Sequence, residues 1–329
     1  MQSGTPGRET SPAAVSTDGP SLAVKPRAWL LDWLQWPAVF AIVSAHVQGD
    51  QRSRILSAGL PLFLICTFVF CSRINARPLG QVVATRWRRL MVPWLFWSLV
   101  YAVAFAAHFW PDTSAIVAQY DRFTLLSGTS SHLWYLPYAF VLGVVAFVLQ
   151  RWLRPLPAAV QVAVLLLAFV ACLAFDQWLG DLDEPCFQWV SSLASVPLGM
   201  LLAGLYGRGL LARRPAVTIT LSMIVSLAGL ALLYGIDGWA HHLPRYMIAG
   251  GLVAAALSLP MRSPSPRTME LHHLIFGIYL THMLVMIVLW QIRPYCPVHI
   301  PRLPFIWLTM IGAGALTYGL RKTPLRRFV

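Results

Sequence analysis

The first candidate for chemistry is a histidine near the end of the first apolar stretch. Residues 28–47, AWLLDWLQWPAVFAIVSAHV, are apolar except for Asp32, Gln35 and His46 and a few small polar groups. At about 100° per residue, Gln35 and His46 fall within about 20° of each other on a helix, and Asp32 lies roughly 40° to one side. Because polar groups are costly in lipid, this stripe should face protein or water. A neutral imidazole there can act as a general base on a hydroxyl. The alternative is a boundary histidine that only hydrogen-bonds a neighbouring helix.

A pair of arginines is the second candidate. Arg86 and Arg89 lie three residues apart in TRWRRLMVP, just before the third apolar run, and so share one helix face. Guanidinium groups suit phosphate oxygens, so the pair could hold a phosphorylated co-substrate such as coenzyme A. The alternative is the ordinary excess of basic residues on the cytoplasmic side of a membrane.

Two later apolar runs carry further polar side chains. His132 and Trp134 open the fourth run in SSHLWYLPY, and Tyr279 and His282 lie in the ninth, in GIYLTH. An aromatic belt at the membrane surface explains Trp134 but leaves His132 unexplained. A hydrogen bond between helices is a sufficient explanation of His282. No spacing of His, Cys, Asp and Glu indicates a metal site, and no Ser/His/Asp nucleophile set, P-loop or dinucleotide motif is present.

The elements that must position these residues are membrane helices. The chain is 57% hydrophobic and only 11% charged, which excludes an ordinary soluble protein and predicts an all-α, polytopic membrane bundle. The net charge of +13 resides in short clusters between apolar runs, so nucleic-acid binding is not indicated. About ten transmembrane helices are expected, near residues 28–47, 55–72, 90–109, 132–150, 157–175, 187–207, 216–235, 244–260, 271–290 and 303–320.

The distribution of basic residues predicts the orientation. With the N-terminus inside, 19 of the 25 Lys and Arg residues fall on the cytoplasmic side, so both termini should be cytoplasmic. We expect residues 1–26 to form a disordered cytoplasmic tail, 27–322 the membrane domain and 323–329 a short cytoplasmic tail. Cys186 and Cys296 fall in outer loops and could pair, although two separate thiols are the default interpretation.

Taken together, these residues resemble the acyltransferase-3 family of integral membrane acyltransferases. Five pieces occur in the family's order and span most of the membrane domain: LDWLQ…SAH, PLFLICTFVF, the Arg-x-x-Arg before a proline, HLWYLP and GIYLTH. The resemblance implies transfer of an acyl group, most commonly acetyl, from cytoplasmic acyl-CoA to a hydroxyl of a glycan or another envelope molecule. It also implies a bacterial plasma (inner) membrane, acyl-CoA as co-substrate, and no permanently bound cofactor or metal.

The resemblance also assigns roles. It makes His46 the catalytic base and Arg86 and Arg89 the donor-binding pair, while Tyr279 and His282 match the family's late Tyr and His. The chain departs from the family at Gln35, where an Arg usually stands eleven residues before the histidine. A glutamine can donate a hydrogen bond but cannot neutralise an anion. A second departure is the pair Cys66-Thr67, where the family usually has Ser-Gly.

The expected partners are acyl-CoA, a glycan or lipid-linked saccharide acceptor, and membrane lipids. Two other functions fit the same sequence. One is a non-catalytic transporter or flippase of a glycan or lipid, which would also use polar stripes and basic inner loops. The other is a degenerate family member that serves as a scaffold, which the departure at Gln35 makes credible. The sequence leaves open the acceptor, the acyl group and the oligomeric state.

Overall fold

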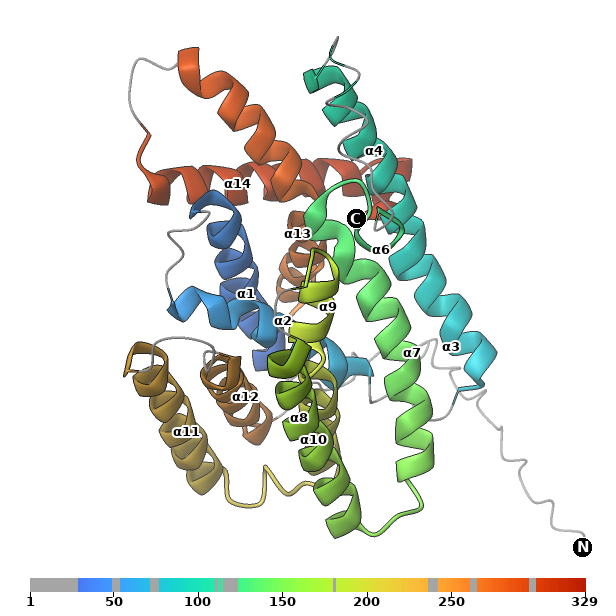
Figure 1. Cartoon of the computed structure of the whole chain (residues 1–329), viewed down its shortest axis with the longest axis vertical. Helices are drawn as coiled ribbons and strands as arrows, with labels where there is room; N and C mark the ends of the chain where they lie inside the picture. Colours follow the sequence, from blue (N-terminus) through green and yellow to red (C-terminus); the bar gives the residue numbers. More distant parts are fainter. Residues whose placement is uncertain are drawn as a thin grey trace, which may run out of the picture.

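The protein is a bundle of helices. The computed structural model describes residues 29–48, 54–71, 77–109, 112, 114, 124–179, 182–235, 242–260, 265–295 and 300–329, and these residues contain helices and no strand (Figure 1). The principal elements are α1 (Trp29–Gln48), η2 (Ile55–Ala58), α2 (Gly59–Cys71), α3 (Leu79–Arg86), the π-helical turn η3 (Trp87–Met91), α4 (Val92–Phe109), α6 (Thr124–Ser127), η4 (Ser131–Trp134), α7 (Tyr135–Leu153), α8 (Ala158–Leu179), α9 (Cys186–Ser192), α10 (Ser195–Gly207), α11 (Pro215–Gly235), α12 (His242–Ser258), α13 (Pro266–Ile292), η6 (Arg293–Tyr295), α14 (Arg302–Arg321) and η7 (Pro324–Phe328).

The predicted all-α membrane bundle is confirmed. Each of the ten apolar runs is helical over most of its length, and eight of the described helices are long and apolar enough to cross a membrane. A further apolar helix, Ile55–Cys71, is shorter than these eight. The exact number of spans and the cytoplasmic placement of both termini stay predictions. The tail 1–26 and Cys296 lie outside the described residues, whereas Cys186 begins α9.

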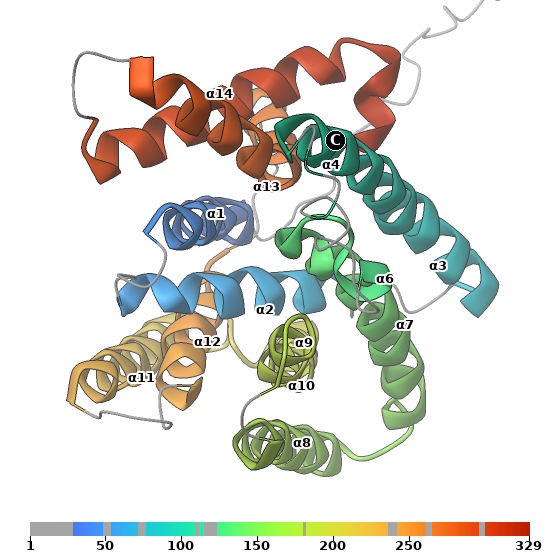
Figure 2. The same ribbon diagram turned by 45° about the horizontal axis from the view of Figure 1, so that its top comes forward.

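Burial separates the central helices from the peripheral ones. Most of α2 is buried where it packs against α1, α10 and α12. On the outside, α8 and α11 expose large apolar side chains, among them Leu167, Val170 and Leu221. Figure 2 places α2 within the ring of helices and α8 and α11 at its rim. Lipid tails solvate such apolar faces, so exposure here is the expected state of a membrane helix.

Close helix contacts depend on small residues. A Cβ added at Gly59 of α2 would lie 2.3 Å from the Cβ of Ala41 in α1 and 3.1 Å from the carbonyl oxygen of Ala38. The two backbones therefore touch without intervening side chains, as is common between membrane helices. This contact fixes α2 against the half of α1 that ends at His46.

The last residues of the chain fold back onto the bundle. The Thr323 hydroxyl accepts a hydrogen bond from the backbone N–H of Leu325 and so begins η7. The ring of Phe328 then stacks on Phe96 of α4 at a centroid distance of 4.2 Å, and the indole N–H of Trp97 donates to the Phe328 carbonyl at 2.9 Å. The segment predicted to be a short tail is thus a helical turn docked on α4.

Candidate functional site: two cavities at opposite ends of four helices

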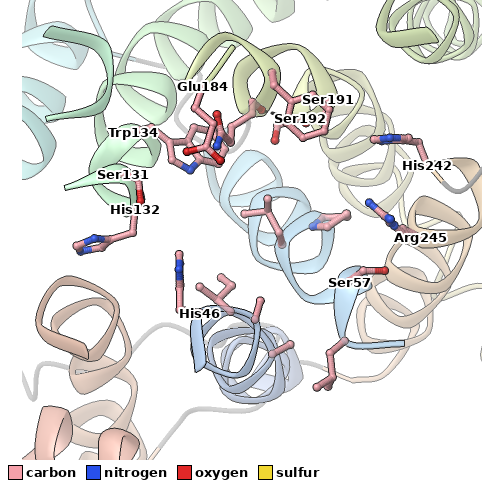
Figure 3. A pocket seen from close by; sticks show the side chains of 18 of the residues that line it. His46, Ser57, Ser131, His132, Trp134, Glu184, Ser191, Ser192, His242 and Arg245 are labelled. Atoms are coloured by element: carbon pink, nitrogen blue, oxygen red, sulfur yellow. Dashed lines mark hydrogen bonds between the residues drawn. The ribbon is translucent and has the colours of Figure 1, made fainter. Parts of the chain in front are cut away.

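A cavity of about 310 Å³, which we call the histidine cavity, opens at the end of α1. His46, His132 and Tyr279 line one side, and His242 and Arg245 of α12 lie across from the two histidines (Figure 3). The predicted residue Trp134 also lines this cavity. The sequence prediction that His46 reaches a polar space is therefore consistent with the structure.

Three histidines from three elements meet beside this cavity. The ring centroid of His46 lies 5.3 Å from that of His282 and 6.4 Å from that of His132, and the latter two rings are 5.0 Å apart. His132 and His282 are buried, whereas His46 is partly exposed. His282 does not line the cavity, but its ring lies against those of the other two histidines. Within the described part of the chain, no three His, Cys, Asp or Glu side chains are grouped to hold a metal ion.

Hydrogen bonds orient the buried rings. The Ser130 hydroxyl lies 2.9 Å from Nδ1 of His132, and Nδ1 of His282 lies 2.7 Å from the carbonyl oxygen of Tyr279 in the preceding turn. The Tyr279 hydroxyl donates to the carbonyl oxygen of His132. With its Nδ1 engaged, His132 has a buried Nε2 atom that no described group hydrogen-bonds. This nitrogen is fully buried, so it is shielded from the cavity that the residue lines.

The sequence did not predict the residues on the far side of the histidine cavity. Nδ1 of His242 lies 3.1 Å from a carboxylate oxygen of Asp176 in α8, and Arg245 follows one turn along α12. Glu184 and Gln188 complete a wall that mixes charged groups with hydrogen-bond donors and acceptors. These residues come from three separate elements, and nothing in their spacing along the chain indicated that they would meet.

A second cavity of about 420 Å³, which we call the arginine cavity, lies near the start of α1. No Asp or Glu lines it within the described part of the chain, although Gln35, His272 and His273 do. Six arginines line it, namely Arg77, Arg86, Arg88, Arg89, Arg321 and Arg327. The predicted pair Arg86 and Arg89 is thus in one cavity, together with four arginines that were not predicted to join it.

Arg86 differs from the other five arginines in its burial. Its side chain is only 9% exposed, and its guanidinium lies directly against α7, because a Cβ added at Gly143 would be 2.0 Å from its Nη1 atom. Among the described residues Arg86 forms no ion pair with an acidic side chain, and its Nε atom has no hydrogen-bond partner. A buried charge is costly unless it is paired, so this cation is poised to bind an anion.

The same four helices line both cavities at their opposite ends. Helix α1 contributes Gln35 to the arginine cavity and His46 to the histidine cavity, eleven residues or about 16 Å further along its axis. Helices α2, α7 with η4, and α13 likewise contribute to both. The polar stripe predicted on α1 is therefore divided between two sites.

Three aromatic rings form the layer between the cavities. Phe63 and Tyr135 line the arginine cavity, and Tyr279 lines the histidine cavity. Their ring centroids lie 5.1 to 5.7 Å apart, so one ring from each of α2, α7 and α13 closes the space. The Tyr135 hydroxyl is 2.8 Å from that of Thr67, which belongs to the Cys66-Thr67 pair of α2. None of the described residues lines both cavities, so this aromatic layer separates the histidines from the arginines.

Asp32 belongs to neither cavity. It is buried between helices, and one of its carboxylate oxygens lies 3.6 Å from Nδ1 of His272 in α13. This contact links the start of α1 to α13 beneath the aromatic layer. Asp32 and His46, which the sequence places on one polar stripe, therefore lie near opposite ends of α1.

Comparison with known proteins agrees with this architecture. A family model described as an acyltransferase domain matches residues 29–320, which is nearly the whole membrane domain. Searches of curated proteins and of solved structures gave no match. The chain therefore belongs to the acyltransferase-3 family of integral membrane acyltransferases.

Proposed function

We propose that the protein is a membrane-embedded O-acyltransferase that moves an acyl group, most commonly acetyl, from cytoplasmic acyl-CoA to a hydroxyl of a cell-envelope or exported glycan. One observation carries the proposal. Arg86, which is buried and forms no ion pair with any described acidic side chain, lies in a cavity with five other arginines, and a single layer of aromatic rings separates that cavity from His46.

The arginine cavity suits the donor. Coenzyme A carries a diphosphate and a 3′-phosphate, and guanidinium groups bind phosphate oxygens through two parallel hydrogen bonds. The orientation predicted from the basic residues puts this cavity on the cytoplasmic side, where acyl-CoA is found. Arg86 and Arg89 would hold the donor, and the acyl end would point along α1 towards the histidine cavity.

The histidine cavity suits the acceptor. Its wall of Glu184, Gln188, Ser191, His242 and Arg245 offers both donors and acceptors of hydrogen bonds, which is the chemistry that a polyhydroxyl compound requires. Its volume of about 310 Å³ lies at the lower end of the range for ligand pockets, so it suits a short part of a saccharide rather than a long chain.

The reaction would be a direct transfer. His46 takes the proton from the acceptor hydroxyl, and the oxygen attacks the thioester carbonyl carbon. A carbon–oxygen bond forms, the carbon–sulfur bond breaks, and the thiolate of CoA leaves and recovers the proton from His46. A positioned general base contributes about a hundredfold to ten-thousandfold to such a step. His132 and His282 would hold the His46 ring in place.

The acyl end must pass the aromatic layer to reach His46. The rings of Phe63, Tyr135 and Tyr279 are side chains, and a change of rotamer in one of them opens a path without movement of the helices. The thin pantetheine arm of CoA suits such a passage, while its nucleotide stays among the arginines.

The test uses radiolabelled acetyl-CoA and inside-out membrane vesicles from cells that lack the protein and are complemented with it. Wild-type protein should transfer label into base-labile esters of envelope material and release free CoA. The His46→Ala variant, inserted to the same level, should do neither.

Other outcomes overturn the proposal. A transporter or flippase would release no CoA from acetyl-CoA with any acceptor material. Label incorporation by His46→Ala at the wild-type rate would exclude the histidine as the base. A wild-type protein that neither binds nor consumes acyl-CoA would fit a scaffold instead.

A further inference from the structure

The docked C-terminal turn contributes a wall to the arginine cavity. Arg321 ends α14 and Arg327 lies in η7, and both line the cavity together with the arginines of α3 and η3. The sequence placed these two residues only among the basic residues of the cytoplasmic side, and residues 323–329 were expected to form a short cytoplasmic tail. The packing of Phe328 on Phe96 holds η7 in this position.

Both side chains are anchored near the rim of the cavity. Nη1 of Arg321 donates to the carbonyl oxygen of His273 at 3.4 Å, and the guanidinium carbon of Arg327 lies 4.8 Å from the centre of the Phe328 ring. Arg326, the residue beside Arg327, is exposed and does not line the cavity. The helical turn therefore directs one of two adjacent arginines to the cavity and leaves the other outside.

The six cations differ in burial. Arg86 is buried next to Tyr135 at the aromatic layer, Arg321 is partly exposed, and the other four, Arg327 among them, are exposed. A donor whose acyl group reaches the aromatic layer beside Arg86 has its adenosine among the exposed arginines. The adenosine carries the 3′-phosphate, a phosphomonoester with close to two negative charges at neutral pH.

We propose that Arg321 and Arg327 form a subsite for the 3′-phosphate of the acyl-CoA donor, which makes the C-terminal turn part of the donor site. This inference rests on the proposed function, because it assumes that the arginine cavity holds CoA. It assigns Arg86 and Arg89 to the remainder of the donor and the C-terminal pair to the one phosphate that distinguishes CoA from 3′-dephospho-CoA.

The experiment compares two ligands and two neighbouring variants. Full-length protein in detergent is titrated with CoA and with 3′-dephospho-CoA by calorimetry. For Arg327→Gln we expect the Kd for CoA to rise about fivefold, the size of one partly exposed ion pair. The Kd for 3′-dephospho-CoA should change by less than about twofold. The matched control, Arg326→Gln, removes the same charge one residue away and should leave both constants within about twofold of the wild type.

The possible results separate this inference from the proposed function. If the wild-type protein binds neither ligand, the proposed donor site fails. If it binds CoA but Arg327→Gln weakens both ligands equally, or no more than Arg326→Gln does, the 3′-phosphate subsite is refuted while the donor site stands. Arg321→Gln provides a second, independent variant. Its Kd for CoA should also rise more than its Kd for 3′-dephospho-CoA.

Discussion

The hydroxyl of Tyr279 in α13 donates a hydrogen bond to the backbone carbonyl of His132 in η4, and both side chains line the cavity that contains His46. This bond joins two elements 147 residues apart at the point where the proposed reaction takes place. We predict that Tyr279→Phe keeps the ring in the aromatic layer but removes the hydrogen bond that holds η4 to α13. Turnover should fall about tenfold or more, because small misplacements of reacting groups are costly. Steady-state transfer rates at saturating donor would measure this loss.

Tyr101→Phe is the control for the loss of a buried hydroxyl. Tyr101 also donates to a backbone carbonyl, that of Leu280, at 2.7 Å, but it lines neither cavity. Each substitution leaves a carbonyl without its donor and should lower the stability by about 1–3 kcal/mol. Tyr101→Phe also removes the acceptor of the Leu284 backbone N–H, which lies 3.2 Å from the hydroxyl. If Tyr101→Phe reduces turnover as much as Tyr279→Phe does, the bond to His132 has a structural role only.

Gly143 in α7 leaves space for the buried guanidinium of Arg86. In Gly143→Ala, the new Cβ would lie 2.0 Å from Nη1 and 2.7 Å from Cζ, so the guanidinium must move. The clash is with the flexible end of a side chain, so the protein should still fold. We expect donor binding to weaken about tenfold, the lower range for a hydrogen-bonded charge pair, with turnover at saturating donor almost unchanged.

Gly314→Ala is the matched substitution for this test. Gly314 also lies inside a membrane helix, but its added Cβ would meet only Ile278 at an ordinary 3.7 Å. Donor affinity should stay at the wild-type value in this variant. Equal effects of the two substitutions would show that Gly143 does not act through Arg86.

The sequence was sufficient to predict the helices and the individual reactive groups. Apolar runs of membrane length predict membrane helices, because few other structures satisfy the backbone in lipid. His46 and Arg86 were identifiable because a polar group beside an apolar run needs an explanation. Their grouping into two cavities was not predictable, since it depends on which helices pack together. The helical stripe from Asp32 to His46 suggested one site, but a helix of about 30 Å reaches two.

Contacts between distant segments explain what was missed. Arg327 joins the arginine cavity only because Phe328 docks on Phe96, a pairing that no local pattern encodes. The Asp176–His242 ion pair likewise brings together α8 and α12. The aromatic layer is a third case, because Phe63 and Tyr135 look like ordinary apolar core residues in the sequence and no local pattern pairs them with Tyr279.

The aromatic layer predicts how the two cavities are kept apart. Phe63 of α2 is buried against Tyr135 and Tyr279, so Phe63→Leu would remove part of the separation and keep an apolar side chain. We expect acetyl-CoA hydrolysis without added acceptor to rise several-fold, because water from the histidine cavity would reach the thioester. Phe305→Leu, a buried ring in α14 that contacts Trp290 and, like Trp290, lines neither cavity, controls for the general loss of an aromatic contact. Unchanged hydrolysis in Phe63→Leu would mean that this ring does not separate the two cavities.

Gln35 in α1 lines the arginine cavity at the position where the family usually has an arginine. Gln35→Arg would add a seventh cation to six that already face one another, so the protein without ligand should melt at a lower temperature. Bound CoA would neutralise the added charge, so the stabilisation by CoA should increase, with a donor Kd lowered about fivefold. Melting temperatures with and without CoA measure both effects.

A glutamine that hydrogen-bonds the donor better than arginine would give the opposite result, with CoA binding weakened by Gln35→Arg. Increased transfer in this variant would identify the wild-type protein as an enzyme with a weakened donor site, whereas no transfer in either form would favour a scaffold.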